Sequence, residues 1–408
     1  MTDSHAHPIS SRTRIVSLDL IRGCALLGIL IMNIQSFSMP GAAYLNPTAF
    51  GDLNGVNFYT WLVSHLFADM KFMSIFSMLF GAGVLVFCER AQQKQGGAAG
   101  LHYRRNFWLL VFGLIHAHFI WYGDILYPYA MCAFIVFWFR NFSAKKLFWT
   151  AIIFLIIGSG YNLFAGYSLP YFPEEAIQEI MRAWRPDAAH IEKELAAYHG
   201  DIFEQFAKRH KEATFMQTQV FFTMFLWRIV GMMCLGMALF KWGILSAERD
   251  AAFYKKLALI CLPIGFALIG YGAMKNIANE FSMEFSFFIG SQFNFWGSIL
   301  VAVGYISLFC LWSKSENLNA LKARFSNVGK MAFTNYILHS LVFTFIFYGH
   351  GLGLFGEVER VITVPMIIGM WIFQLWYSPI WLKHFKFGPL EWAWRCLTYW
   401  EVQPMRRA

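Results

Sequence analysis

The chain has 408 residues, of which 58% are hydrophobic and only 14% are charged. A soluble domain carries about a quarter charged residues, so this composition excludes an ordinary soluble protein. The formal net charge of +9 does not indicate nucleic-acid binding, because excess Lys and Arg in a membrane protein usually lies in cytoplasmic loops. We therefore expect an all-α, polytopic membrane helix bundle that forms a single domain over residues 1–408.

Ten apolar segments are long enough to cross a bilayer as helices. They lie at 15–37, 57–88, 104–121, 124–140, 146–168, 217–241, 255–274, 287–312, 328–348 and 361–382. Lys and Arg gather before the first segment, in alternate loops and in the tail, and all these positions share one side when ten spans alternate. The positive-inside rule then predicts about ten transmembrane helices with both termini in the cytoplasm.

The first two spans contain charged side chains. Asp19 and Arg22 are three residues apart, so they meet on one helix face either as a structural ion pair or as part of a site. Asn33 follows eleven residues after Arg22, on roughly the same face. Lys71 falls near the middle of the second span, which predicts a break or re-entrant bend at Asp69 to Lys71. A lysine at this depth must reach an acid, a carbonyl or water, and the candidate partners are a phosphate or acidic ligand and an acid from another span.

The stretch 104–130 reads RRNFWLLVFGLIHAHFIWYGDILYPYA and places polar groups at both ends of an apolar run. Arg104 and Arg105 open it. His116 lies within the run, and Asp124 follows a tight turn. The last two are eight residues apart, about 12 Å along a continuous helix, so they share a site only if the chain folds back between them. A buried acid beside an imidazole is a candidate for proton transfer.

Segment 170–215 is the one long loop, and it falls on the external side. Its charges are of mixed sign, which argues against a patch for nucleic acid or anionic lipid. Apolar residues recur at helical spacing in IQEIMRAW and DIFEQFAKR, so we expect two short amphipathic helices on the outer surface or capping the bundle. The seven cysteines show no metal-ligand spacing, and we expect no metal.

Two later spans contain further polar residues. Arg228 lies inside the sixth span and requires a partner, for which Asp19 and Asp124 are the candidates. In the ninth span, Asn335 and His339 lie on one helix face, four residues apart. The motifs GxSxG, GxGxxG, HExxH and the Walker loop are absent from the sequence, so hydrolase elbows, dinucleotide enzymes, zincins and ATPases receive no support.

Five blocks of the chain resemble, in the same order, the YeiB-like family of bacterial inner-membrane proteins of unknown function. They are RIVSLDLIRG (14–23), KFMSIFSMLFGAG (71–83), GLIHAHFIWYGDILYPYA (113–130), GKMAFTNYILHS (329–340) and FGPLEWAWRCLTY (387–399). The family looks like a branch of the transmembrane acyltransferases, which include the heparan glucosaminide acetyltransferases and the glycan O-acyltransferases. The spacing of Arg22 and Asn33 is similar to the first-span pattern of that larger group. Loop 38–56 departs from it, because the heparan enzymes carry a catalytic histidine there and this loop has none.

The resemblance implies transfer of an acyl group, most simply acetyl, from cytoplasmic acyl-CoA to an extracytoplasmic glycan or other small-molecule acceptor. His116 with Asp124 is our candidate base in place of the missing loop histidine, and His339 is the alternative. Asn33, Asn335 and Lys71 are candidate donors to the oxyanion or binders of the cofactor.

Arg22, Arg104 and Arg105 are candidates for the CoA phosphates near the cytoplasmic surface. The competing hypotheses are a transporter or flippase of a small polar or lipid-linked substrate, and a structural or sensory membrane protein. In each case the partners include membrane lipids and exclude nucleic acid. A homodimer is compatible with the sequence, and the expected location is the bacterial inner membrane.

Overall fold

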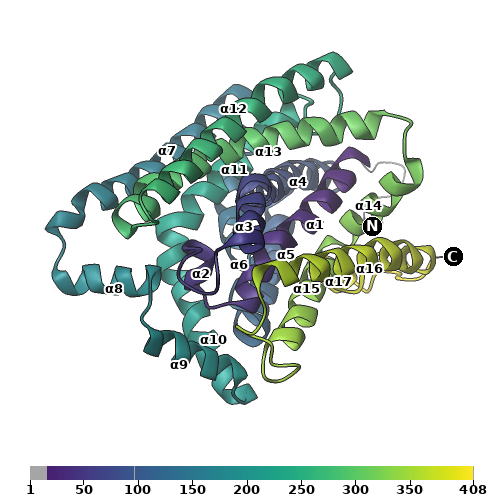
Figure 1. Cartoon of the computed structure of the whole chain (residues 1–408). Helices are drawn as coiled ribbons and strands as arrows, with labels where there is room; N and C mark the ends of the chain where they lie inside the picture. The colour runs from purple at the N-terminus through teal and green to yellow at the C-terminus, as the bar shows by residue number, and fades with distance from the viewer. Residues whose placement is uncertain (1–15, 96, 408) are drawn as a thin grey trace.

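The computed structural model describes residues 16–95 and 97–407, which form an all-helical molecule (Figure 1). Within these residues, β-type pairing is limited to one isolated antiparallel bridge between Phe385 and Arg406. The α-helices are α1 (Val16–Ser38), α2 (Ala42–Leu45), α3 (Gly55–Phe67), α4 (Lys71–Gln95), α5 (Ala99–Ile115), α6 (Leu126–Val136), α7 (Ala144–Ser168), α8 (Glu174–Trp184), α9 (Ala188–His199), α10 (Ile202–Phe215), α11 (Leu226–Lys241), α12 (Ala251–Ala278), α13 (Ser291–Lys314), α14 (Asn319–Lys330), α15 (Ala332–Phe347), α16 (Thr363–His384) and α17 (Pro389–Tyr399). The π-helical segments are η2 (His116–Ile120), η5 (Met216–Phe225) and η6 (Met283–Gly290).

Among the described residues, seven helices are long and apolar enough to cross a membrane, which makes this a multi-pass membrane protein. They are α1, α3 with α4, α7, α10 with α11, α12, η6 with α13, and the helix that contains α16. An eighth crossing results if α14 and α15, which meet at 79°, form one bent span. The predicted spans 104–121 and 124–140 are helical, as α5 with η2 and as α6, but α6 is short for a crossing.

Helix α1 is the central element of the bundle and contacts α4, α13, α14, α15 and α16. Two glycines allow its closest approach, to α14. A Cβ added to Gly23 would collide with the carbonyl oxygen of Phe325, and one added to Gly329 would collide with that of Asp19. Small residues at such crossings let helix backbones pack closely where the hydrophobic effect between helices is weak.

The second span is broken, as the sequence predicts. Helix α3 ends at Phe67 and α4 begins at Lys71, and the intervening Met70 has φ +63°. A left-handed conformation is costly for a residue with a Cβ and persists only where the surroundings impose it. The break frees backbone carbonyls inside the bundle, and these require donors from side chains.

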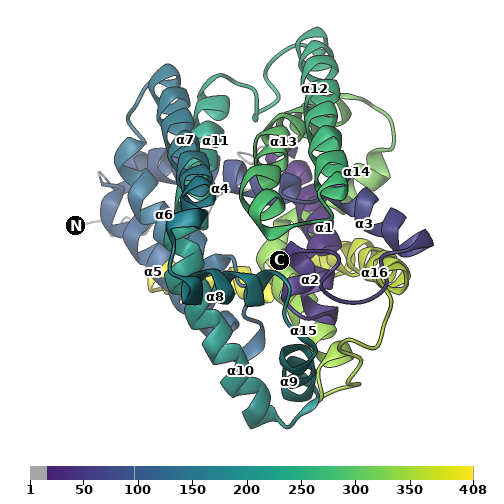
Figure 2. The ribbon, with the colours of Figure 1, turned by 60° about the vertical axis from the view of Figure 1, so that its left-hand side comes forward.

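Segment 170–215 contains three helices, α8, α9 and α10, so the prediction of two was wrong. Helix α9 was missed, and α10 continues through η5 into α11. The signal was the pair of aspartates that begin the helices: Asp187 accepts a hydrogen bond from His190 N–H, and Asp201 forms a capping box with Glu204. The three helices gather at one end of the molecule (Figure 2).

The loops contact one another in two groups. At the end covered by α8 to α10, Glu194 accepts a hydrogen bond from Gly41 N–H, Gly349 N–H donates to the Tyr198 carbonyl, and Trp184 Nε1–H donates to the Phe281 carbonyl. A second group joins the other loops, where Lys241 donates to the carbonyls of Arg140 and Phe142, Lys314 to that of Ala247, and Trp394 to that of Arg105. These groups define two opposite ends of the bundle.

Candidate functional site

The structure brings His116 and Asp124 together at the turn between α5 and α6. His116 Nδ1 lies 2.7 Å from Asp124 Oδ1, and Asp124 Oδ2 accepts a 2.6 Å hydrogen bond from Tyr127 N–H. Tyr127 lies in the first turn of α6, where N–H groups have no partner within the helix, so the carboxylate both caps α6 and orients the imidazole. This is the fold-back that the sequence requires for a shared site.

Local backbone features make this turn tight. A Cβ on Gly113 would collide with the Tyr127 backbone nitrogen and lie 3.0 Å from Asp124 Oδ2, so only glycine lets α6 start this close to α5. His116 is the first residue of the π-helical η2, a type of segment that frequently occurs at functional sites. Arg209 of α10 donates hydrogen bonds to the carbonyls of His118 and Ile120, which satisfies backbone groups that η2 leaves open.

Ser340 of α15 completes the arrangement, and the sequence analysis did not predict it. Its Oγ lies 2.8 Å from His116 Nε2, on the opposite side of the ring from Asp124. An ionised carboxylate only accepts hydrogen bonds, so we assign Nδ1 as the donor to Asp124 and Nε2 as the acceptor of the Ser340 hydroxyl. Ser340, His116 and Asp124 therefore have the connectivity of a nucleophile, a base and an orienting acid.

The three side chains are buried, with exposed fractions of 0% for Ser340, 1% for His116 and 5% for Asp124. The Tyr336 ring lies 5.2 Å from that of His116, edge to face, and the Tyr336 hydroxyl accepts a hydrogen bond from Ile125 N–H. A cavity of about 10 Å³ beside Asp124, lined by η2, the start of α6 and η5, has room for about one water. The three side chains are shielded from bulk solvent, which strengthens the electrostatic interactions between them.

His339 and Asn335 lie on the other face of α15 and do not join this group. His339 Nε2 is 2.9 Å from Gln374 Oε1 of α16, and Gln374 Nε2–H donates to the Asn335 carbonyl. Asn335 Nδ2–H donates to Ser378 and to the Val328 carbonyl. These bonds tie α15 to α16 and to the end of α14. The adjacent Ser340, one position on, points to His116 because successive helical residues are about 100° apart.

The candidates on α1 are placed as follows. Arg22 NH1 lies 2.8 Å from Asp19 Oδ1, the contact that their spacing predicts. Asn33 is half-buried further along the same helix, and its side chain makes no hydrogen bond with the described residues. The residues that the structure describes contain no cluster of three or more His, Cys, Asp or Glu that could hold a metal ion.

Arg104 and Arg105 lie against the C-terminal helix α17 and its flank. The Arg104 guanidinium stacks 4.4 Å from the Trp400 ring, and that of Arg105 lies between Phe87 at 4.7 Å and Trp394 at 4.4 Å. Stacking uses the faces of a guanidinium and leaves its edge N–H groups for other partners.

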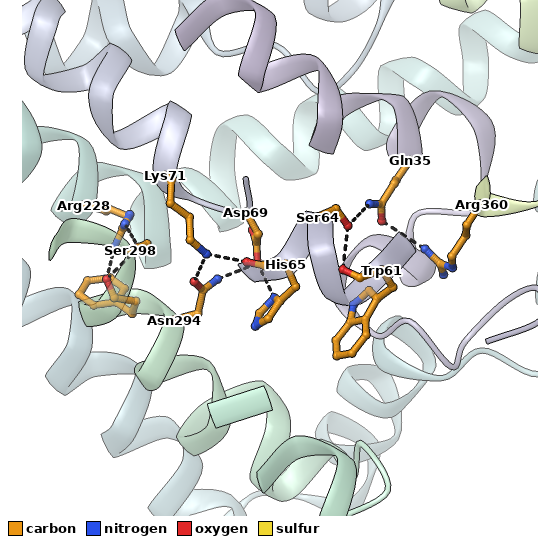
Figure 3. Close-up of polar contacts among 11 residues, drawn as sticks. Gln35, Trp61, Ser64, His65, Asp69, Lys71, Arg228, Asn294, Ser298 and Arg360 are labelled. Atoms are coloured by element: carbon orange, nitrogen blue, oxygen red, sulfur yellow. Dashed lines mark hydrogen bonds and ion pairs between the residues drawn. The ribbon is translucent and has the colours of Figure 1, made fainter. Parts of the chain in front are cut away.

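A second buried network spans the break between α3 and α4 (Figure 3). Lys71 Nζ donates to the His65 carbonyl at 2.6 Å and to Asn294 Oδ1 at 2.8 Å, and Asn294 Nδ2–H donates to Asp69 Oδ2. His65 Nδ1 lies 3.0 Å from the same Asp69 oxygen. Lys71 therefore caps the carbonyl end of α3, where a cation is favourable, and Asn294 joins it to Asp69.

The expected partners of Arg228 were wrong. Arg228 contacts neither Asp19 nor Asp124; it donates to the hydroxyls of Ser74 and Ser298 and to the Phe295 carbonyl, at 2.8–3.0 Å. Figure 3 shows its contact with Ser298. Its position on α11 faces α4 and α13, whereas Asp19 pairs with Arg22 and Asp124 with His116. Its buried Nε has no partner among the described residues.

The chain is similar over nearly its whole length to uncharacterized bacterial proteins. The family model described as "Protein of unknown function (DUF418)" matches residues 239–401. Over 402 residues the chain is 31% identical to the uncharacterized protein YeiB of Escherichia coli, covering 94% of this chain and 96% of that protein. The chain belongs to the YeiB-like family.

Other members of this family are similar over their whole length. The uncharacterized protein YxaH of Bacillus subtilis is 31% identical over 436 residues, with 99% of each chain covered. An uncharacterized 39.9 kDa protein from the amylase 3' region of Bacillus acidopullulyticus is 28% identical, with 96% of each covered. No solved structure matches the chain.

Proposed function

We propose that the protein is a transmembrane acyltransferase that moves an acyl group, most simply acetyl, from cytoplasmic acyl-CoA to an extracytoplasmic glycan or other small-molecule acceptor. The observation that carries the proposal is the buried imidazole of His116, bonded to Asp124 through one nitrogen and to a hydroxyl through the other. A hydroxyl attacks a thioester readily only when a base removes its proton, and this pair supplies an oriented base. A hydrogen bond that only held helices together would require neither the Asp124 carboxylate beside His116 nor the burial of both side chains.

Cations lie at a suitable distance for the CoA phosphates. Arg22 and Arg395 are close enough to Arg105 for their positive charges to repel that of Arg105, and Arg104 is adjacent in sequence. From Arg104 to His116 the chain runs twelve residues, about 18 Å along a helix, so the long pantetheine arm would connect phosphates at one end with a thioester at the other. We assign the phosphate-binding role to Arg104, Arg105 and Arg22.

The proposed topology has ten crossings with both termini in the cytoplasm of a bacterium, in its inner membrane. Its support is the division of loop contacts into two groups, because the predicted external loops contact one another and the predicted cytoplasmic loops contact one another. The cationic end then faces the acyl-CoA pool, and α8 to α10 cover the acceptor side. The resemblance of the Arg22 and Asn33 spacing to the first span of transmembrane acyltransferases supports the same assignment.

The decisive measurement is acetyl-CoA binding to the purified protein in detergent micelles, with transfer of radiolabel from acetyl-CoA to a bacterial envelope extract. Reversing the charge of both Arg104 and Arg105 to Glu should weaken acetyl-CoA binding at least about tenfold, since two phosphate contacts are lost. Lys145→Glu with Lys146→Glu is the matched control, because these exposed lysines change the net charge equally on the same side. Equal dissociation constants for acetyl-CoA in the two double variants would show that Arg104 and Arg105 do not bind its phosphates.

The second candidate function is a transporter or flippase of a small polar or lipid-linked substrate. The broken α3–α4 span, with the buried Lys71 and Arg228 and the half-buried Asp69 near it, is the observation that favours it. Against it, Lys71 and Asp69 are already hydrogen-bonded within the bundle and hold the break together. A transporter has no reason to bind acyl-CoA, so the binding measurement separates the two candidates.

A further inference from the structure

Both ring nitrogens of His116 are engaged, and this limits which proton the base removes. Nδ1 faces Asp124, so only Nε2 can accept a proton, and Nε2 faces Ser340 at 2.8 Å. An acceptor hydroxyl in a direct transfer would have to displace Ser340 from this position. The group in place to lose a proton to His116 is therefore the Ser340 hydroxyl.

The hydroxyl of Ser340 is also oriented unusually for a helix. Serine and threonine inside helices often donate to the carbonyl four residues earlier, as Ser74, Ser77, Ser307 and Thr344 do in this chain. Ser340 instead has His116 as its hydrogen-bond partner. Among the described residues, the Ser340 hydroxyl hydrogen-bonds to the imidazole and to no helix carbonyl.

We propose that Ser340 is the nucleophile that carries the acyl group between the two substrates, an assignment that rests on the proposed acyltransferase function. In the first step a bond forms between Ser340 Oγ and the thioester carbonyl carbon, the carbon–sulfur bond breaks, and His116 passes the serine proton to the CoA sulfur. In the second step the acceptor hydroxyl attacks the acyl-serine ester, its proton goes through His116 to Ser340 Oγ, and the ester bond to serine breaks. No oxidant or further co-reactant is required.

The surroundings suit a covalent intermediate. Complete burial of Ser340 keeps bulk water from hydrolysing the ester. Tyr336 lies one turn earlier on the same face of α15, and its hydroxyl hydrogen is available to the oxyanion that forms at the acyl carbon. The sequential steps also let acyl-CoA and acceptor use the site in turn, from opposite sides of the membrane.

The test uses the full-length protein in detergent micelles with radiolabelled acetyl-CoA and no acceptor. A double displacement releases a burst of one CoA per protein and leaves one acetyl group on the peptide that contains Ser340, identified by mass spectrometry. Ser340→Ala and His116→Ala should abolish both, and Ser340→Ala should lower label transfer to an envelope extract at least about a thousandfold. Ser340→Cys should accumulate a hydroxylamine-sensitive thioester. Ser378→Ala, which alters another fully buried hydroxyl on α16, should retain the burst.

The failures of the two proposals differ. Label transfer to the envelope extract without a burst, together with Ser340→Ala activity near that of the unaltered protein, would overturn the covalent role and leave a direct-transfer acyltransferase. Absence of acetyl-CoA binding and of label transfer would overturn the acyltransferase function, and the covalent role with it. Folding of each variant is checked by its elution as a single species and by its thermal transition. If Ser340→Ala does not fold, the burst of CoA and the labelled peptide of the unaltered protein decide whether Ser340 carries the acyl group.

Discussion

Replacing Asp124 by Asn should inactivate the protein while leaving its fold intact. Asp124 Oδ2 accepts a hydrogen bond from Tyr127 N–H, a group that can only donate, so the amide oxygen of Asn must face Tyr127. The amide NH₂ then faces His116 Nδ1 and forces that nitrogen to be the acceptor. His116 would carry its proton on Nε2, where it cannot accept the proton of Ser340.

The expected loss of turnover is about a thousandfold to ten-thousandfold, the range for a wrong tautomer in a buried triad. This corresponds to about 4 to 5 kcal/mol of transition-state stabilisation. Acetyl-CoA affinity should change little, because the base acts in the transition state.

The assay is label transfer from acetyl-CoA to an envelope extract, measured for Asp124→Asn, His116→Ala and the double variant. The double variant should be little worse than either single one, since the residues act as a unit. His118→Ala is the control, because His118 lies two residues away and contacts Gln217 instead of Asp124. Turnover of Asp124→Asn within about threefold of the unaltered protein would refute the tautomer argument.

Three further predictions concern the frame of the site. A reporter fused to the C-terminus should be cytoplasmic and one inserted in 170–215 external; a periplasmic C-terminus would refute the ten-crossing topology. Glu391→Ala should destabilise the protein in denaturant titrations by about 2 to 4 kcal/mol. The reason is that the Glu391 carboxylate accepts hydrogen bonds from Phe333 N–H, Thr334 N–H and the Thr334 hydroxyl at the start of α15. A loss of stability no larger than that of the exposed Glu316→Ala would exclude this capping role. Burial raises the pKa of Glu194, so its net contribution to stability is largest below the ordinary carboxyl pKa and is lost as pH rises through the raised one. The thermal transition should therefore fall over that pH range, and an equal fall in Glu194→Gln would contradict this.

Hydropathy predicted the helical class and most spans because a bilayer-crossing helix is apolar along its whole length. Hydropathy predicted helix length and bends less well where a helix packs against other helices and not against lipid. Helix α6 is short, and α14 and α15 meet at a sharp bend whose free N–H groups are satisfied by Glu391, more than fifty residues away. No periodicity within α15 indicates that distant carboxylate. Helix α9 could have been predicted from Asp187, the residue that caps its N-terminus. This signal was overlooked because Asp187 lies among many other charged residues.

Part of the candidate site could be predicted because two of its residues are close in the sequence. His116 and Asp124 belong to one hairpin, so eight residues and a turn were enough to suggest a contact. Ser340 lies 224 residues beyond His116, and only packing of α15 against η2 makes them neighbours. Arg228 was misassigned because a buried cation was expected to find an acid, whereas two serines and a carbonyl satisfy most of its donors.

The two buried polar networks differ in a way that bears on function. Around the α3–α4 break, each contact of Lys71 satisfies a group that the broken helix or its neighbour leaves open, and removing any member would leave a buried donor or acceptor unpaired. Around His116, Asp124 has a structural role because it caps α6, but the Ser340 hydroxyl serves no donor or acceptor except the imidazole. Stability alone explains the first network and the carboxylate of the second, and it leaves the imidazole–hydroxyl pair without a structural role. A protein that needed only packing at this position would place an apolar side chain there, since a buried polar group contributes little net stability even when paired. The hydrogen bond between His116 and Ser340 is therefore the part of this site for which the proposed proton transfer supplies a reason.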